Sequence, residues 1–248
     1  MSFLSKIFGS KGNNVTADLN LLGVDMHSHL IPGIDDGAAT LEDATELIRQ
    51  MKSLGYRKLI ITPHIKDDSY RNNPAIIKDN LEILKKHLSE NNVEIELDIA
   101  AEYFMDYEFG EKFSKEKILT FGRNYVLIEL SYFNPPPNLD TLIFDLQTNG
   151  YRPILAHVER YPYWHFDFKT YQKYKDRGVY FQLNIISLSG YYSMGVKKVA
   201  EKLIEKGMIE FLGTDMHNQT YLDSLKRSLH SKHLIQLLDS NKLLNNKL

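Results

Sequence analysis

The sequence VDMHSHLIPGIDDG, residues 24–37, places two histidines and two aspartates in a short segment that begins with apolar residues. His27 and His29 are separated by one residue, so an extended backbone directs both imidazoles to the same side, where they can reach one metal ion. Taken alone, an H-x-H pattern is equally consistent with two unrelated histidines near a loop. The interpretation of this segment therefore depends on the rest of the chain.

The composition is that of a globular protein, with 43% hydrophobic and 25% charged residues in 248. The formal net charge of −2 provides no strong positive field, so we expect no nucleic-acid partner. The absence of cysteine excludes disulfides, thiolate metal sites and a cysteine nucleophile, and it is consistent with a cytoplasmic location. A transmembrane helix needs about 20 apolar residues. No apolar run in the sequence approaches this length, so we expect no transmembrane helix.

Short apolar segments alternate with longer amphipathic segments along most of the chain. The apolar segments predict seven strands, at residues 21–26, 57–62, 94–101, 125–130, 152–157, 179–184 and 208–215. Strands alternating with helices are typical of parallel βα units, and their number predicts an α/β fold with a distorted seven-stranded (β/α) barrel. We expect one domain over residues 21–248, after a flexible N-terminal tail over residues 1–20. The leucine-rich segment 221–248 is predicted to pack on the barrel or to form a subunit contact.

In (β/α) barrels, the functional residues gather at the carboxyl ends of the strands. The predicted strand ends carry histidines, carboxylates and one amide, in chain order His27, His29, His64, Glu102, Glu129, His157, Asn184, Asp215 and His217. Any one of these residues alone could be a helix cap, a solvated charge or a loop residue. Their repeated placement at strand ends predicts a metal centre at one mouth of the barrel.

This donor set is too large for one zinc ion, which takes three protein ligands and a water in catalytic sites. Two or three ions about 3.5–4 Å apart would use all of the donors. Nitrogen and oxygen donors without sulfur suit manganese, iron or zinc. Such a centre generates hydroxide near neutral pH and holds phosphoryl oxygens in line. Arg160 could bind the remaining phosphate oxygens, or it could form a surface salt bridge, for example with Glu159.

Six segments resemble the PHP (polymerase and histidinol phosphatase) superfamily, and more narrowly the bacterial capsule-biosynthesis protein-tyrosine phosphatases of the CpsB/CapC/YwqE type. They are DMHSHLIPGIDDGA, TPH at His64, AE at Glu102, IEL at Glu129, AHVERY around Arg160, and TDMHN at residues 214–218. The resemblance extends from about Leu22 to Asn218. The combination of HSH…DDG with H-x-E-R-Y is specific to the phosphatase branch.

The resemblance implies a distorted barrel that carries three metal ions, with manganese the usual ion in assays. It assigns the first ion to His27, His29, Glu102 and Asp215, the second to Glu102, Glu129 and His157, and the third to Asp36, His64 and His217. Arg160 would bind the substrate phosphate, and the expected catalytic residues are Arg160, Asp215 and His217. Asp35 is expected to shape the turn or to support a ligand.

The implied function is hydrolysis of phosphotyrosine by metal-activated hydroxide. The implied substrate is the C-terminal tail of a tyrosine kinase that regulates capsular and exopolysaccharide synthesis in the bacterial cytoplasm. The alternatives are a phosphoesterase for a small molecule such as histidinol phosphate and a non-catalytic kinase-binding adaptor. A homo-oligomer is possible. Aromatic residues in the expected rim loops could stack on a tyrosine ring or serve loop packing; they are Tyr103, Phe104, Tyr132, Phe133, Tyr161, Tyr163 and Trp164.

Overall fold

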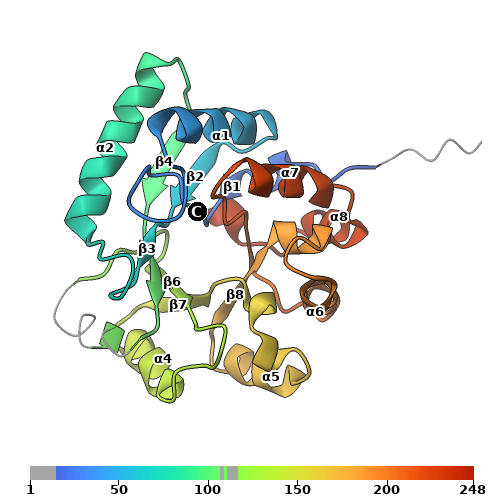
Figure 1. The fold of residues 1–248 in the computed structure, drawn as a ribbon. Helices are drawn as coiled ribbons and strands as arrows, with labels where there is room; N and C mark the ends of the chain where they lie inside the picture. The colour runs from blue at the N-terminus through green and yellow to red at the C-terminus, as the bar shows by residue number, and fades with distance from the viewer. Residues whose placement is uncertain (1–14, 107–108, 111–116) are drawn as a thin grey trace, which may run out of the picture.

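The structure is a computed structural model that describes residues 15–106, 109–110 and 117–248. Parallel strands surround the centre of the molecule, and the helices lie outside them (Figure 1). Among the described residues, no helix is both long enough and apolar enough to cross a membrane. The architecture therefore consists of an inner layer of strands and an outer layer of helices.

The strands of the described chain form two sheets, in which every strand pair is parallel. The strands are β1 (Val24–Asp25), β2 (Lys58–Ile61), β3 (His64–Ile65), β4 (Glu96–Ile99), β5 (Glu102–Phe104), β6 (Tyr125–Glu129), β7 (Arg152–Leu155), β8 (Tyr180–Asn184) and β9 (Phe211–Gly213). The three-stranded sheet has the order β1-β2-β4, and the six-stranded sheet has the order β3-β5-β6-β7-β8-β9. The predicted α/β fold with parallel strands is confirmed, whereas the predicted count of seven strands is not.

The strand count differs because two predicted strands are each followed by a short additional strand. The strand predicted at 57–62 corresponds to β2 and is followed by β3, and the strand predicted at 94–101 corresponds to β4 and is followed by β5. Proline cannot donate to a ladder, and Pro63 lies between β2 and β3. Hydrogen bonds still cross these breaks, because Glu102 N donates to Pro63 O at 3.1 Å. At the other side, an isolated parallel bridge joins Ser28 to Met216, so the two sheets adjoin there as well.

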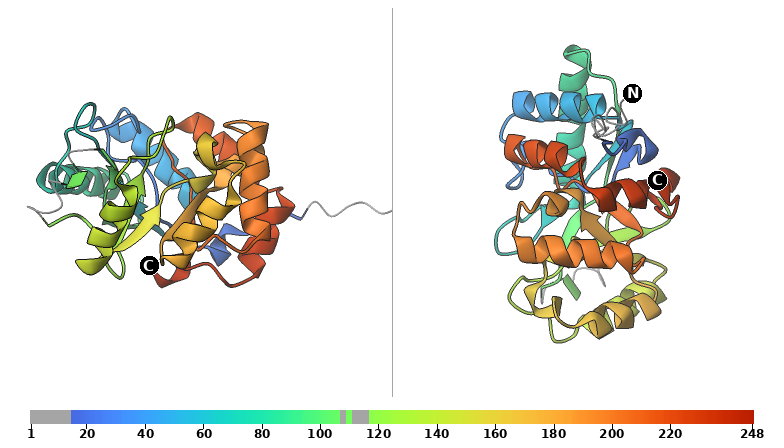
Figure 2. Two further views of the ribbon diagram at one scale, coloured as in Figure 1. Left: turned by 90° about the horizontal axis from the view of Figure 1, so that it is seen from below. Right: turned by 90° about the vertical axis from the view of Figure 1, so that its right-hand side faces the viewer.

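The outer helices alternate with most of the strands along the chain. They are α1 (Leu41–Ser53), α2 (Pro74–Glu90), α4 (Leu139–Thr148), α5 (Phe168–Asp176), α6 (Met194–Glu205), α7 (Gln219–Ser228) and α8 (Lys232–Asp239). The Thr40 side chain caps α1, and Asn73 caps α2 directly before a proline at the first helical position. The helices remain outside the strands in the other views of the molecule (Figure 2). The leucine-rich helices α7 and α8 bury Leu222 and Leu234, so their apolar faces pack on the protein.

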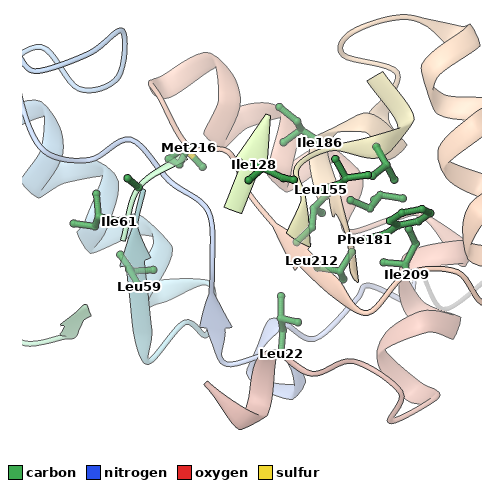
Figure 3. Packing of buried hydrophobic residues seen from close by; sticks show 14 of the residues in the cluster. Leu22, Leu59, Ile61, Ile128, Leu155, Phe181, Ile186, Ile209, Leu212 and Met216 are labelled. Atoms are coloured by element: carbon green, nitrogen blue, oxygen red, sulfur yellow. The ribbon is translucent and has the colours of Figure 1, made fainter. Parts of the chain in front are cut away.

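Two apolar clusters cover the two faces of the strands. The larger cluster lies between strands and helices and includes Leu59, Ile61, Ile128, Leu155, Phe181 and Leu212 (Figure 3). The smaller cluster includes Ile60 and Leu127, whose sequence neighbours Ile61 and Ile128 belong to the larger one. Because successive side chains point to opposite faces of a strand, the smaller cluster fills the inside of the strand layer. Burial on both faces explains the continuous apolar runs in the sequence.

The segment after α8 closes the inner cluster. Leu244 and Leu248 pack against that cluster, and Asn245 is completely buried. The Asn245 side-chain amide donates to Val24 O at 3.0 Å and to Leu212 O at 2.7 Å, and its oxygen accepts from Leu212 N at 3.0 Å. One side chain thus ties the C-terminal segment to β1 and β9.

The structure corrects the predicted tail boundary. Ala17 and Leu19 are buried, and Ala17 N donates to Leu229 O at 2.8 Å. Ala17 and Leu19 therefore belong to the core, although the flexible tail was predicted to extend to residue 20. Residues 1–14 of the predicted tail lie outside the described residues.

Replacing Asn245 with alanine should leave three buried backbone groups without partners. Each such group costs about 1–3 kcal/mol, so we expect N245A to lower the free energy of unfolding by about 3 kcal/mol in urea denaturation. The matched control is N246A, because Asn246 is exposed and its amide donates to Leu21 O; we expect a change below about 1 kcal/mol there. Equal effects of the two substitutions would contradict this account.

Candidate metal centre

The residues predicted to act in the site converge at the carboxyl ends of the strands. A cavity of about 510 Å³ is lined by Asp36, His64, Glu102, Glu129, His157, Arg160, Asp215 and His217. His27 and His29 are completely buried, and both approach Glu102 and Asp215. The structure thus brings together every residue that the sequence selected for the site.

Four donor atoms form the most compact part of the site. His27 Nε2 lies 3.2 Å from Glu102 Oε2 and 3.4 Å from Asp215 Oδ1. His29 Nε2 lies 3.4 Å from each of these oxygens and 3.2 Å from His27 Nε2. These separations exceed the about 2.7–2.9 Å of charge-assisted hydrogen bonds. These five separations are close to the edge, about 3.3–3.4 Å, of a tetrahedron whose centre lies about 2.0–2.1 Å from each donor. Donor atoms of His27, His29 and Asp215 lie within 4.8 Å of one another and could hold one ion.

The tautomers of the two histidines show why these donors fit a cation. His27 Nδ1 lies 3.1 Å from Gln182 Oε1, and His29 Nδ1 lies 2.8 Å from Asp35 Oδ2. Both partners are acceptors, so each Nδ1 carries a hydrogen, and each imidazole that gives up its second proton presents an Nε2 lone pair to the centre. Two facing lone pairs repel unless a cation lies between them. Within the described residues, Glu102 Oε2 is also buried without a hydrogen-bond partner. The donor set therefore fits a divalent metal ion.

His64 is shared by two further groups of donors. Its Nδ1 lies 3.2 Å from Glu102 Oε2 and 3.8 Å from Glu129 Oε2. Its Nε2 lies 3.5 Å from Asp36 Oδ1, which is also 3.5 Å from His217 Nε2. His64 thus lies between the predicted second and third ion sites, whereas the sequence assigned it to the third.

The carboxylate of Glu102 contacts several histidines through both oxygens. His157 Nε2 lies 3.1 Å from Glu102 Oε1 and 3.6 Å from Glu129 Oε1. The other oxygen, Oε2, faces His27, His29 and His64. Glu102 therefore contacts histidines from all three groups that the resemblance assigned.

Arg160 lies beside this centre in a fixed orientation. Its Nη1 donates to Asp215 Oδ2 at 3.1 Å. Its guanidinium carbon lies 4.0 Å from the ring centre of Tyr192 and 4.7 Å from that of Tyr132. Asn184 Nδ2 and the Tyr192 hydroxyl also donate to Asp215 Oδ2, at 2.7 and 3.1 Å. Asp215 thus directs one oxygen to the histidines and the other to Arg160.

The backbone that carries Asp215 adopts a left-handed conformation, with φ of 53°. This conformation is unfavourable for a residue other than glycine. The buried Asp25 carboxylate holds the preceding residue, because it accepts from both Thr214 N and Thr214 Oγ1. Gly213 completes the support, since a Cβ there would lie 2.7 Å from His27 Cβ. Packing around this turn therefore stabilises the position of Asp215.

In the metal-free protein, the balance of burial and neighbouring charges favours the protonated forms of two side chains that would bind a metal ion. Burial disfavours the charged form of His27, but the Glu102 and Asp215 carboxylates outweigh it and raise the pKa of His27 to about 9. Burial and the adjacent Glu102 carboxylate raise the pKa of Glu129 to about 8. Burial and the Arg160 charge lower the pKa of His157 to about 4, so this histidine is neutral at pH 7. The metal-free centre thus holds protons on His27 and Glu129.

Several supporting residues were not identified from the sequence. Gln182 accepts from His27 Nδ1 and from His157 N, and its own amide donates to Asn184 Oδ1. Its position two residues before the strand-end Asn184 was an available signal, because both side chains share one face of β8. Tyr192 lies in a connecting segment, and no local pattern marked it.

The aromatic residues considered for the rim divide into two sets. Phe104, Tyr132 and Phe133 line the cavity, whereas Tyr103, Tyr161 and Trp164 are buried in the core. Tyr163 stacks on Tyr161 and donates to Ser131 O. The three cavity-lining residues could therefore stack on a substrate ring, whereas the other four pack against the protein itself.

Parallel strands with a histidine and carboxylate centre at their carboxyl ends are typical of metal-dependent hydrolases. Residues 23–231 match the model of a family described as capsular polysaccharide synthesis, CpsB/CapC. The match covers most of the chain, and the chain belongs to this family.

Named relatives agree with this membership. The chain is 28% identical over 217 residues to the tyrosine-protein phosphatase YwqE of Bacillus subtilis, covering 87% of this chain and 84% of that protein. It is 26% identical over 201 residues to the tyrosine-protein phosphatase CpsB of Streptococcus pneumoniae, covering 79% of this chain and 83% of that protein.

Solved structures show the same fold. Crystal structures of YwqE from Bacillus subtilis and CpsB from Streptococcus pneumoniae are reported as those of unique metal-dependent tyrosine phosphatases. The comparison gives a TM-score of 0.77 at 27% identity, covering 88% of this chain and 87% of that chain. An organophosphorus hydrolase variant has a TM-score of 0.51 at 12% identity over 94% of this chain, a likeness of fold alone.

Metal binding should release protons. A divalent ion binds the deprotonated forms of His27 and Glu129, whose pKa values are raised to about 9 and about 8. The affinity for Mn²⁺ should therefore rise as the pH increases from about 6 to about 9. Calorimetry in two buffers of different ionisation enthalpy measures the protons released. An affinity independent of pH over this range would contradict the assignment.

Removing the Gln182 acceptor should weaken metal binding. Q182L leaves His27 Nδ1 and His157 N without this partner, so the tautomer and the ring orientation of His27 are no longer fixed. We expect the affinity for Mn²⁺ to fall by about 10- to 100-fold, measured by calorimetry. The matched control is Q147L, because Gln147 is half-buried outside the site and donates to Arg177 O; an equal loss there would refute the role of Gln182.

Proposed function

We propose that this protein is a metal-dependent protein-tyrosine phosphatase. The observation that carries the proposal is the close approach of His27 and His29 to the Glu102 and Asp215 carboxylates, at 3.2–3.4 Å, with Arg160 bound to the same Asp215. Membership of the CpsB/CapC family and similarity to proteins named tyrosine-protein phosphatases support the activity.

In this proposal, His27, His29, Glu102 and Asp215 hold the first ion. Glu102, Glu129 and His157 hold the second, with His64 contributing to this group or to a third one with Asp36 and His217. Manganese is proposed as the ion, with iron or zinc as alternatives, because the donors are nitrogen and oxygen without sulfur. When bound, such ions supply a water of lowered pKa and a Lewis acid for phosphoryl oxygens.

The side chains around the donors orient the substrate. Arg160 carries a planar guanidinium that suits two phosphate oxygens, and Tyr132 and Tyr192 restrict it to one plane. Asp215 fixes one edge of this guanidinium and so directs its remaining N–H groups. The chain has no cysteine, so a cysteinyl-phosphate intermediate cannot form on this protein.

We extend the proposal to the setting of the reaction. The substrate would be a phosphotyrosine protein, specifically the C-terminal tail of a tyrosine kinase that regulates capsular and exopolysaccharide synthesis; the family description supports this connection. The reaction would take place in the bacterial cytoplasm, which suits a chain without cysteine. A homo-oligomer is part of the proposal and is tested by sedimentation.

The metal-stripped protein, reconstituted with Mn²⁺, should hydrolyse phosphotyrosine peptides faster than histidinol phosphate. We expect D215A to lose bound metal by elemental analysis and to lower kcat/KM by more than about 100-fold, the upper range for supporting residues alone. The matched control is H230A, which changes an exposed histidine outside the site and should leave both measurements unchanged.

Three results would reject the proposal. A large preference for histidinol phosphate would indicate a small-molecule phosphoesterase. A folded wild-type protein without bound metal and without activity in Mn²⁺ would favour a non-catalytic adaptor. Retention of full activity by a folded D215A variant would show that the centre is not catalytic.

A further inference from the structure

A second layer of side chains lies directly outside the donors. Lys66, Phe104 and Ser131 each follow a predicted ligand by two residues, after His64, Glu102 and Glu129 respectively, and all three line the cavity. In extended chain, residues two apart point to the same side and lie about 6.6 Å apart. This distance of about 6.6 Å is comparable to the length of a phosphorylated phenol ring. A peptide whose phosphate reaches the donors would thus meet this layer with its backbone and neighbouring side chains.

Lys66 is held at the cavity by a tight turn. Lys66 N donates to Tyr70 O at 2.9 Å, and Tyr70 N donates to Lys66 O at 2.8 Å. The Tyr70 ring stacks on His64 with centres 5.3 Å apart, so the turn is packed against a proposed ligand. The Lys66 ammonium lies 4.5 Å from the centre of the Phe104 ring. Both the backbone and the side chain of Lys66 are therefore restrained.

The charge of Lys66 is accessible to a substrate. Among the cavity-lining residues of the described chain, the permanent positive charges belong to Lys66 and Arg160. Lys66 pairs with Asp68 at 3.6 Å, and the Asp68 side chain is 73% exposed. Exposed pairs of this kind contribute little, so a substrate carboxylate can compete for the ammonium. Arg160 is already bound to Asp215.

Phe133 adds an aromatic surface on the same rim. It lines the cavity, yet it is 92% exposed. Its loop is fixed at one end, because the Tyr163 hydroxyl donates to Ser131 O at 2.9 Å and Phe133 N donates to Ser131 Oγ at 3.2 Å. Prolines at 135–137 restrict the other end. An exposed aromatic side chain on a stiff loop loses little conformational entropy when a peptide covers it.

We propose that Lys66, Phe104 and Phe133 form a subsite for the residue that flanks the phosphotyrosine, and that the subsite prefers an acidic side chain. The inference rests on the proposed phosphatase function. Lys66 would attract the flanking carboxylate, and the two phenylalanine rings would cover the adjacent peptide. The cavity volume of about 510 Å³ falls in the range of about 300–1,000 Å³ that accommodates whole ligands, so it leaves room beyond the phosphate.

The experiment compares phosphotyrosine peptides that differ only in the flanking residues, aspartate or asparagine. With the Mn²⁺-loaded protein at low ionic strength, we expect kcat/KM to be about threefold higher for the aspartate peptide. K66M should reduce this ratio to about one, and K66E should invert it. Free phosphotyrosine should be hydrolysed equally by all three proteins. The matched control is K85M, which removes a lysine from an exposed ion pair on α2.

A binding measurement tests the aromatic part of the subsite. F133A should weaken the affinity for a non-hydrolysable phosphonate peptide by about fivefold in fluorescence anisotropy. The matched control is F144A, since Phe144 is 63% exposed and lies outside the cavity lining. An equal loss in F144A would overturn the assignment of Phe133.

The possible failures are distinguishable. Equal rates for the aspartate and asparagine peptides would overturn the subsite and leave the phosphatase function intact. A loss of free phosphotyrosine hydrolysis in K66M, equal to its loss on peptides, would place Lys66 on the phosphate and overturn the subsite. Absence of free phosphotyrosine hydrolysis by the wild-type protein would overturn both proposals.

Discussion

The structure depends on the forced proximity of buried donors that repel one another. Nε2 of His27 and Nε2 of His29 lie 3.2 Å apart at the centre of the protein, beside two carboxylates. Without a positive charge between them, this arrangement costs free energy, because lone pairs and anions are held together away from water. A proton lowers this cost in the metal-free protein, and a divalent ion would lower it further. The fold stabilises a geometry that its own side chains disfavour.

Hydrogen bonds made by individual side chains around the centre maintain this geometry. Gln182 and Asp35 determine which nitrogen of each histidine carries the hydrogen, and Asp25 secures the turn before Asp215. Asp25 and Asp35 belong to the segment 24–37, whereas Gln182 belongs to β8. The scaffold therefore limits donor movement in several directions, and a displacement of any one element would disturb the whole centre.

Much of the fold and the site could be predicted because their signals are local. Strand ends were marked by apolar runs that stop at a polar residue, as at His157 and Asp215. Pro63 is a local signal for the break between β2 and the short strand β3, which was not predicted. Burial of Ala17 and the contacts of Asn245 and Gln182 depend on pairings across the folded chain, for which no local pattern exists. Tyr192 was missed for the same reason.

The two oxygens of Asp215 face different partners, the histidine donors on one side and Arg160 on the other. A charge shared in this manner links two binding equilibria thermodynamically. Any anion that draws Arg160 away from Asp215 leaves that carboxylate with more negative charge to offer a cation. By reciprocity, a cation that draws on Asp215 loosens its hold on Arg160 and frees the guanidinium for an anion. Cation and anion would thus be bound cooperatively, through a single side chain and without movement of the backbone.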